Sequence, residues 1–190
     1  MKLLRFLVAV ALIEMLMVHA MAQTDRLPLQ AVSQLNVQRY LGRWYEIAKF
    51  PNRFQKQCVS DTTADYSLMP GGYIRVLNQC RSGDGNWEIA TGLAKQIDGP
   101  QSAKLKVRFA PEWLSFLPFV WGDYWVIDLD EKYELVAVSE PHREFLWVLS
   151  RAPVVSELKY AELLSRLIAV GLNVNHLEKT QHPLASVNQW

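Results

Sequence analysis

The residues best suited to chemistry in this chain are its two cysteines, Cys58 and Cys80. In an exported protein, an isolated pair most simply forms one disulfide. The bond would close a loop of about 23 residues, which stabilises a fold by roughly 3 kcal/mol in the chain-entropy model. A free reactive thiol is the alternative, but no histidine neighbours either cysteine in the sequence. We therefore predict a Cys58–Cys80 disulfide.

Other groups that could act on a substrate are scattered along the chain. His142, His176 and His182 are separated and lack the spacing of metal ligands. There is no G-x-S-x-G motif and no glycine-rich phosphate loop, and Gly71-Gly72 is typical of a turn. We therefore predict no enzymatic activity, no cofactor and no metal site.

The charges are balanced and dispersed. The 20 Lys and Arg residues are matched by 19 Asp and Glu residues, which leaves a formal net charge of +1. This composition gives no electrostatic case for binding nucleic acid. Aromatic residues make up 11% of the chain and include seven tryptophans. So many large rings without a charged site favour an apolar interior and a hydrophobic ligand.

The first 22 residues have the order of a secretory signal peptide. Two positive charges precede an apolar run from Phe6 to Val18, and Ala20-Met21-Ala22 is a cleavage-site pattern. The run is shorter than the roughly 20 residues that span a bilayer; an uncleaved anchor is the alternative. We expect residues 1–22 to be removed and residues 23–190 to form a single domain. With no cysteine near the cleavage site, we expect a soluble protein, periplasmic or secreted, without a lipid-anchored N-terminal Cys.

Short apolar runs separated by turn signals follow from residue 44 to residue 151. In one of them Leu105, Val107 and Phe109 share a face and the charges share the other, which is typical of a half-buried strand. Eight such runs favour an antiparallel sandwich or barrel, and an eight-stranded barrel can be filled by side chains or can hold one small ligand. The predicted strands are Trp44–Phe50, Thr62–Leu68, Tyr73–Arg81, Trp87–Lys95, Lys104–Phe109, Asp123–Leu129, Tyr133–Val138 and Phe145–Arg151.

After Pro153 the apolar period becomes helical. Ser156 is a candidate N-cap and Gly171 a stop, so the pattern predicts an amphipathic helix over about 156–170. Its apolar face needs a partner, and the outside of the barrel, over about 40–151, is the large surface available. The tail, 172–190, is expected to add a short strand around Leu177–Thr180 or to wrap the barrel.

Three motifs resemble those of the lipocalin family. They are Gly42-Arg-Trp44 at the start of the first strand, Gly122-Asp-Tyr-Trp-Val-Ile-Asp128, and Leu146-Trp-Val-Leu-Ser-Arg151 before the helix. Within the family the chain is most similar to the bacterial lipocalins of the outer-membrane lipoprotein type and to apolipoprotein D, for example over Tyr40–Ile47 and Asp65–Met69. The likeness runs from about residue 36 to about residue 178.

The resemblance implies a fold and a closed end. The fold would be an all-β, eight-stranded antiparallel up-and-down lipocalin β-barrel with a C-terminal α-helix packed on its outside. Trp44 would pack under the barrel with Arg151 laid across its ring, a favourable cation–π pair. Gly42 would let the chain pass close as it enters the barrel. These three residues are therefore expected to be structural.

The resemblance also implies binding, storage or transport of a small hydrophobic ligand in the barrel cup, with a role in cell-envelope lipid handling. A fatty acid or lysophospholipid is the ligand class implied, although a sterol, a pigment or a tetrapyrrole would suit such a cup. Likeness and strand alternation from Trp44 place Glu46 inward, where a buried carboxylate needs a partner unless it faces out. The predicted ligand-binding residues are Ala48, Phe50, Tyr66, Val76, Asn78, Val107, Phe109, Trp121, Tyr124, Trp147 and Leu149.

The loop over residues 110–122 is unusually apolar for a surface segment. It could close over the cup as a lid, form a homodimer contact, or touch a membrane. The residues expected to make such a contact are Trp113, Leu114, Phe116, Leu117 and Phe119.

Two other functions remain open on the sequence. A few lipocalins are isomerases that use a free thiol in the cup, which here would need an unpaired cysteine facing inward. A barrel filled by side chains would instead be an interaction module without a ligand.

Overall fold

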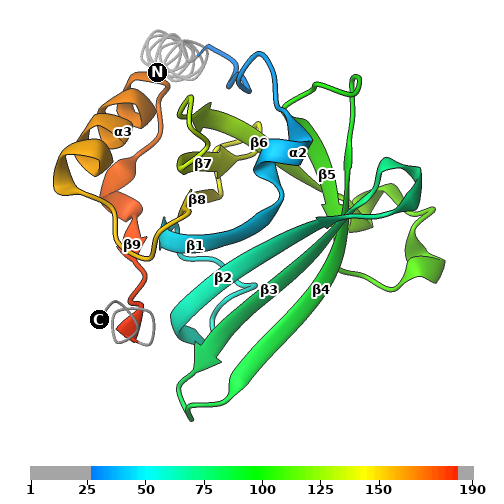
Figure 1. Cartoon of the computed structure of the whole chain (residues 1–190), viewed down its shortest axis with the longest axis horizontal. Helices are drawn as coiled ribbons and strands as arrows, with labels where there is room; N and C mark the ends of the chain where they lie inside the picture. The colour runs from blue at the N-terminus through cyan, green and yellow to red at the C-terminus, as the bar shows by residue number, and fades with distance from the viewer. Residues whose placement is uncertain (1–26, 184–190) are drawn as a thin grey trace, which may run out of the picture.

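The computed structural model describes residues 27–183, so the predicted signal peptide lies outside the described residues. Eight antiparallel strands close into a barrel in the order β2-β3-β4-β5-β6-β7-β8-β1, with β1 paired back to β2 (Figure 1). The predicted fold is confirmed. The strands are β1 (Gly42–Lys49), β2 (Cys58–Leu68), β3 (Ile74–Ser82), β4 (Trp87–Gln96), β5 (Lys104–Arg108), β6 (Gly122–Leu129), β7 (Leu135–Ser139) and β8 (Leu146–Ser150).

Short helical turns punctuate the strands. Helix α2 (Val37–Tyr40) begins at Asn36, whose side chain accepts a hydrogen bond from the Arg39 N–H, and it leads directly into β1. The 3₁₀ turns are η1 (Pro70–Gly72), η2 (Glu112–Leu114), η3 (Pro118–Val120) and η4 (Val174–His176).

Helix α3 (Glu157–Ala169) packs on the outside of the barrel, as predicted (Figure 1). The Ser156 side chain caps its first turn, and Gly171 follows its end with a φ of 83°. Leu163 and Leu167, at helical spacing, are at most 1% exposed because they pack against the outer faces of β7 and β8. The apolar stripe of the helix therefore forms a second core outside the barrel.

The tail contributes a strand to the wall. Strand β9 (Glu178–Lys179) pairs with the end of β1, and Gln181 bridges to Ser60 at the start of β2. Backbone hydrogen bonds of 2.9 Å from Thr180 N–H to the Ile47 carbonyl and 2.8 Å from Asp61 N–H to the Gln181 carbonyl hold it there. Because β1 and β2 pair directly only near the start of β1, the tail fills the seam between them.

The two cores follow from strand alternation. The inner cluster fills the lower barrel, and the outer cluster lies between barrel and α3. Inner members include Trp44, Ala64, Tyr66, Ile74, Val76, Ala94, Leu105, Val126, Val136, Val138 and Leu149. Outer members include Ala48, Phe50, Leu135, Ala137, Leu146, Val148, Tyr160, Leu163, Leu167 and Leu172.

The prediction that Ala48 and Phe50 line the interior is wrong. Both belong to the outer cluster, beside α3. The alternation from Trp44 fails because β1 carries a β-bulge, in which Ile47 is an extra residue relative to β8. One extra residue reverses the facing of every later position in the strand.

The bulge also determines what does face inward. Before it, Glu46 pairs with Leu149 of the inner cluster. After it, Lys49 pairs with Trp147, which packs against the same cluster. The upper part of β1 therefore presents Lys49 to the interior, where Ala48 and Phe50 were expected.

Candidate ligand-binding site

The closed end of the barrel is sealed by an arginine on a tryptophan. Trp44 is fully buried, and the Arg151 guanidinium carbon lies 3.9 Å from its ring centroid. Arg151 also donates hydrogen bonds of 2.8 Å to the carbonyls of Arg43 and Arg39. Gly42 has a φ of 90°, and a Cβ there would lie 3.4 Å from Arg151 Nη1. The arrangement ties α2, β1 and the end of β8 into one base.

Three tyrosines form the floor above this base. The Tyr124 hydroxyl lies 2.6 Å from that of Tyr40 and 2.9 Å from that of Tyr66. Burial raises the pKa of Tyr66 to about 12 and raises the pKa values of Tyr40 and Tyr124 well above their ordinary value. The floor is therefore a set of neutral hydrogen-bonding hydroxyls.

One inner wall carries a polar group among small residues. Val76 is 3% exposed in the inner cluster, and Asn78 is the next position on the same face of β3. Asn78 pairs with Ala64 on β2 and Ala90 on β4. Its Oδ1 is buried without a hydrogen-bond partner. The inner wall therefore carries a buried amide oxygen whose hydrogen-bonding capacity is unused among the described residues.

Phe109 follows the mouth end of β5, two strands away from Asn78 in the same sheet. It follows Val107, which packs on the inner cluster, and its ring sits where a Cβ on Gly92 would be, at 2.8 Å. Phe109 is nevertheless 45% exposed, and Ala90 on the neighbouring inner face is exposed as well. Side chains therefore leave the upper part of this inner face accessible.

Trp147 lies where the inner wall reaches the mouth. Its indole Nε1–H donates to Gln55 Oε1 at 2.8 Å, which fixes the ring against the loop after β1. Phe145 stacks on it at 5.8 Å between centroids, and Phe54 lies 5.6 Å from Phe145. Aromatic side chains from two loops and one strand therefore meet at the rim, with Leu149 below Trp147 on the same face.

Glu46 faces inward and has partners. Its Oε2 accepts a 2.6 Å hydrogen bond from Gln55, and its Oε1 accepts one of 2.6 Å from Thr180. The expected burial of the carboxylate is thus compensated by hydrogen bonds. One carboxylate consequently links the tail, the loop after β1 and, through Gln55, Trp147.

Trp121 does not line the cup, which corrects the prediction. Its ring lies 4.7 Å from Lys95 Nζ and 5.3 Å from the Arg108 guanidinium carbon. Both cations alternate with inner-face residues of β4 and β5, so they lie on the outer face. The end of the loop folds back over the outside of the barrel because these two cations attract the indole.

The rest of the loop after β5 projects its rings into solvent. Trp113, Phe116 and Phe119 are 73%, 75% and 81% exposed, whereas Leu114 and Leu117 are half-buried. In an up-and-down barrel this loop shares an end with the loops after β1, β3 and β7. The exposed rings therefore belong to the mouth of the barrel.

The disulfide is confirmed. Cys58 and Cys80 are bonded, with Cα atoms 5.5 Å apart. Register shifts between Cys58 and Thr63 supply the bend that brings Cys58 opposite the end of β3. Since the chain has no other cysteine, the bond leaves no thiol for the isomerase alternative.

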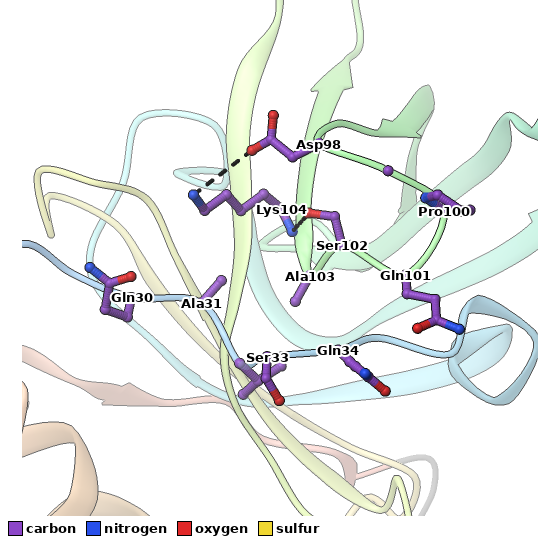
Figure 2. A pocket seen from close by; sticks show the side chains of 12 residues that line it. Gln30, Ala31, Ser33, Gln34, Asp98, Pro100, Gln101, Ser102, Ala103 and Lys104 are labelled. Carbon is purple, nitrogen blue, oxygen red and sulfur yellow. Dashed lines mark hydrogen bonds and ion pairs between the residues drawn. The ribbon is translucent and has the colours of Figure 1, made fainter.

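A hollow of about 430 Å³ lies elsewhere, between residues 30–34 and residues 98–104 (Figure 2). Its walls mix polar and apolar side chains, and an ion pair of 3.8 Å between Lys104 and Asp98 borders it. None of the predicted ligand-binding residues lines it. Within residues 27–183, no group of three or more His, Cys, Asp or Glu is placed to hold a metal.

The structure thus brings together part of the predicted set and adds to it. Tyr66, Tyr124, Val76, Asn78, Val107, Phe109, Trp147 and Leu149 lie on the inner face, while Ala48, Phe50 and Trp121 lie outside it. Sequence reasoning missed Lys49 because no residue type at positions 46–48 signals a bulge. It missed Gln55 because a loop residue has no period from which its direction could be inferred.

Comparisons with known proteins agree with this geometry. A lipocalin-like domain model matches residues 35–182. Temperature-induced lipocalin-1 of Arabidopsis thaliana is 42% identical over 160 residues, covering 83% of this chain and 84% of that protein. Outer membrane lipoprotein Blc of Escherichia coli K12 is 37% identical over 178 residues, covering 93% and 96%. Mouse apolipoprotein D is 36% identical over 152 residues, covering 76% of each.

Solved structures show the same fold at low sequence identity. Insecticyanin from the tobacco hornworm Manduca sexta matches with a TM-score of 0.62 and 17% identity, covering 82% of this chain and 85% of that one. Lobster apocrustacyanin A1 matches with a TM-score of 0.60 and 14% identity, covering 77% and 79%. The fold, the family model and the relatives converge: this chain belongs to the lipocalin family, whose members are generally non-enzymatic proteins that bind and transport small hydrophobic ligands.

Proposed function

We propose that this protein binds a fatty acid or a lysophospholipid in its barrel and carries it within the cell envelope, without catalysing a reaction. The observation that carries the proposal is Phe109, an inward-facing ring that is 45% exposed. In a barrel filled by side chains, an inward aromatic residue would be buried as fully as Trp44. An accessible inner face next to a closed floor is the arrangement that a bound acyl chain requires.

The chemistry of the inner face fits such a ligand. Aromatic and aliphatic side chains dominate, and the polar groups are few: the tyrosine hydroxyls, Asn78 and the Glu46 network. A sixteen-carbon chain that leaves water gains roughly 0.8 kcal/mol per methylene, about 13 kcal/mol gross. After the costs of association and ordering, binding in the micromolar to nanomolar range is expected.

Native mass spectrometry of the purified protein tests the proposal directly, because a ligand that co-purifies adds its own mass. A titration with a fluorescent fatty acid should show saturable uptake. Trp147→Ala should weaken that uptake about tenfold or more, since the indole is a large apolar surface on the inner wall. Trp87→Ala is the matched control, because Trp87 lies on the outward face of β4. Absence of uptake by the unaltered protein would instead support the interaction-module alternative.

For the loop after β5 we favour contact with a lipid surface over a lid or a homodimer. Trp113, Phe116 and Phe119 extend into solvent from two consecutive 3₁₀ turns at the mouth. Trp121 anchors the loop on the outside of the barrel, which supports a contact outside the cup. At a membrane interface, the apolar surface of an aromatic ring leaves water and contacts lipid.

The disulfide indicates an oxidising compartment outside the cytoplasm. Relatives include outer-membrane lipoproteins. Among residues 27–183, no helix is long and apolar enough to cross a membrane. We propose a periplasmic or secreted protein, released by cleavage after Ala22.

A further inference from the structure

The bulge in β1 places one lysine on the inner face of the barrel. Lys49 pairs with Trp147 on one side and with Glu178 of β9 on the other. Its chain neighbours Ala48 and Phe50 both pack in the outer cluster. The Lys49 side chain is only 13% exposed, so it lies largely out of water, on the same face of the wall as its strand partner Trp147.

Cations on other strands of the barrel face the opposite way. Arg75 on β3, Lys95 on β4 and Lys106 on β5 each sit beside an inner-cluster residue in the chain and therefore alternate outward. The inward position of Lys49 is thus a specific consequence of the bulge.

The ammonium of Lys49 has charged neighbours but no close partner among the described residues. Nζ lies 3.9 Å from Glu46 Oε1 and 3.9 Å from Glu178 Oε2. Both distances exceed the hydrogen-bonding range of about 2.7–3.2 Å. Glu46 is already engaged at 2.6 Å by Gln55 and by Thr180, and Glu178 is 62% exposed. The three N–H donors of Lys49 therefore remain available to a nearer acceptor.

We propose that Lys49 binds the acidic group, carboxylate or phosphate, of the ligand, a step that rests on the proposed ligand-binding function. A charge-assisted hydrogen bond to Nζ at about 2.8 Å would satisfy the half-buried ammonium better than carboxylates at 3.9 Å. It would lay the adjoining acyl chain against Trp147, with the chain end toward the tyrosine floor. Lys49 then selects acidic lipids over neutral lipids of the same chain length.

The test compares acidic and neutral lipids on charge variants of the full protein. The probe is N-phenyl-1-naphthylamine, a neutral dye, which is displaced by palmitate, by 1-palmitoyl lysophosphatidic acid or by neutral 1-palmitoylglycerol. Lys49→Met should weaken the binding of one or both acidic lipids about tenfold, which is the loss of affinity expected for one charge-assisted hydrogen bond. It should leave the dye and palmitoylglycerol unchanged, and Lys49→Arg should restore acidic binding to within about threefold.

Lys179→Met is the matched control. It removes the same charge from the neighbouring position of β9, but it lies on the outward face with an ion pair to Glu157. It should bind all three lipids like the unaltered protein. Glu178→Gln should tighten the binding of acidic lipids about twofold, because the carboxylate that competes with the lipid for the Lys49 ammonium loses its charge.

The outcomes separate this inference from the proposed function. A loss confined to palmitate, or to lysophosphatidic acid, supports the inference and identifies the acidic group as carboxylate or phosphate. Equal binding of all lipids to Lys49→Met and the unaltered protein overturns the inference and leaves the proposed function standing, as does an equal loss for palmitoylglycerol. Failure of the unaltered protein to bind any of the lipids overturns the proposed function itself.

Discussion

Arg151 shows how one side chain can secure several segments at once. Its guanidinium covers the Trp44 ring and donates to backbone carbonyls of α2 and β1. Arg151→Met should lower the free energy of unfolding by about 2–4 kcal/mol, because a cation–π contact and charged hydrogen bonds disappear together. Urea denaturation followed by circular dichroism measures the change.

Arg166→Gln is the control for that substitution. Arg166 pairs with Asp128 at 2.7 Å, but its side chain is 50% exposed. An exposed ion pair contributes about 0–1 kcal/mol, so the two variants should differ clearly. Equal losses of unfolding free energy in the two variants would show that Arg151, despite its contact with Trp44, contributes no more than an exposed ion pair.

Gly92 is required by the ring that rests on it. A Cβ at this position would lie 2.8 Å from the Phe109 ring and 2.9 Å from the Arg108 carbonyl oxygen. Gly92→Ala should cost about 1–3 kcal/mol of stability and should shift Phe109, with weaker uptake of fluorescent fatty acid. Gly83→Ala, where the nearest atom is 4.0 Å away, should change stability by less than about 0.5 kcal/mol in the same urea titration. An unchanged Gly92→Ala protein would refute the close contact.

The resemblance to known lipocalins, together with strand alternation, predicts most of the inner face. The resemblance places Tyr66, Tyr124 and Trp147 there, and each lies on a strand segment without a register shift around it. Lys49 could not be placed this way, since its facing depends on the extra residue Ile47. Trp121 could not either, because a loop side chain is positioned by the cations it meets, and these come from distant strands.

Elements were more predictable than individual side chains. Turn signals separate the strands, and α3 has Ser156 and Gly171 as boundaries, so the order of the elements follows from local chemistry. The exact bounds follow less well: β2 begins four residues before its predicted start at Thr62. The seam between β1 and β2 was less predictable. Its filling by β9 depends on contacts between segments far apart in the chain, which local patterns do not encode.

The loop after β5 is the element expected to meet membranes. A triple variant of Trp113, Phe116 and Phe119 to Ser should reduce binding to phosphatidylethanolamine–phosphatidylglycerol vesicles by at least about tenfold, since each ring offers apolar area to the interface. The fold should persist, because all three rings are exposed. Vesicle co-sedimentation measures the effect. Ile89→Ser is the control, because Ile89 is an exposed apolar side chain on β4, outside the loop.

Two results would contradict this prediction. One is an unaltered protein that does not sediment with vesicles at all. The other is a dimer, detected by analytical ultracentrifugation, that the triple variant converts to a monomer; it would assign the rings to a contact between two copies.

At the scale of the whole molecule, the tyrosine floor makes stability dependent on alkaline pH. The pKa of Tyr66 is raised by burial to about 12, against about 10 in an unfolded chain. The folded state holds the Tyr66 proton more tightly than the unfolded chain does. The contribution of protonated Tyr66 to the free energy of unfolding is therefore fully present below pH 10 and is lost as the pH rises toward 12. The expected slope is about 1 kcal/mol per pH unit for this one group.

Urea titrations between pH 9 and pH 12 measure the slope. Tyr66→Phe lacks the ionising group, so its stability should fall less steeply over that interval than that of the unaltered protein. The difference between the two proteins isolates Tyr66 from lysines that titrate in the same range. Parallel curves would show that Tyr66 ionises as readily in the folded state as in the unfolded chain.

The tail strand also sets the order in which the barrel can be completed. Lys179 pairs with Ala48, 131 positions earlier in the chain, so the seam beside β1 stays open until nearly all the described residues are available. A chain synthesised from its N-terminus therefore cannot close its wall early. Pairing between such distant segments costs chain entropy before its contacts form, so completion of the wall is expected to be slow. The pairing that completes the seam is thus one of the last that a growing chain can form.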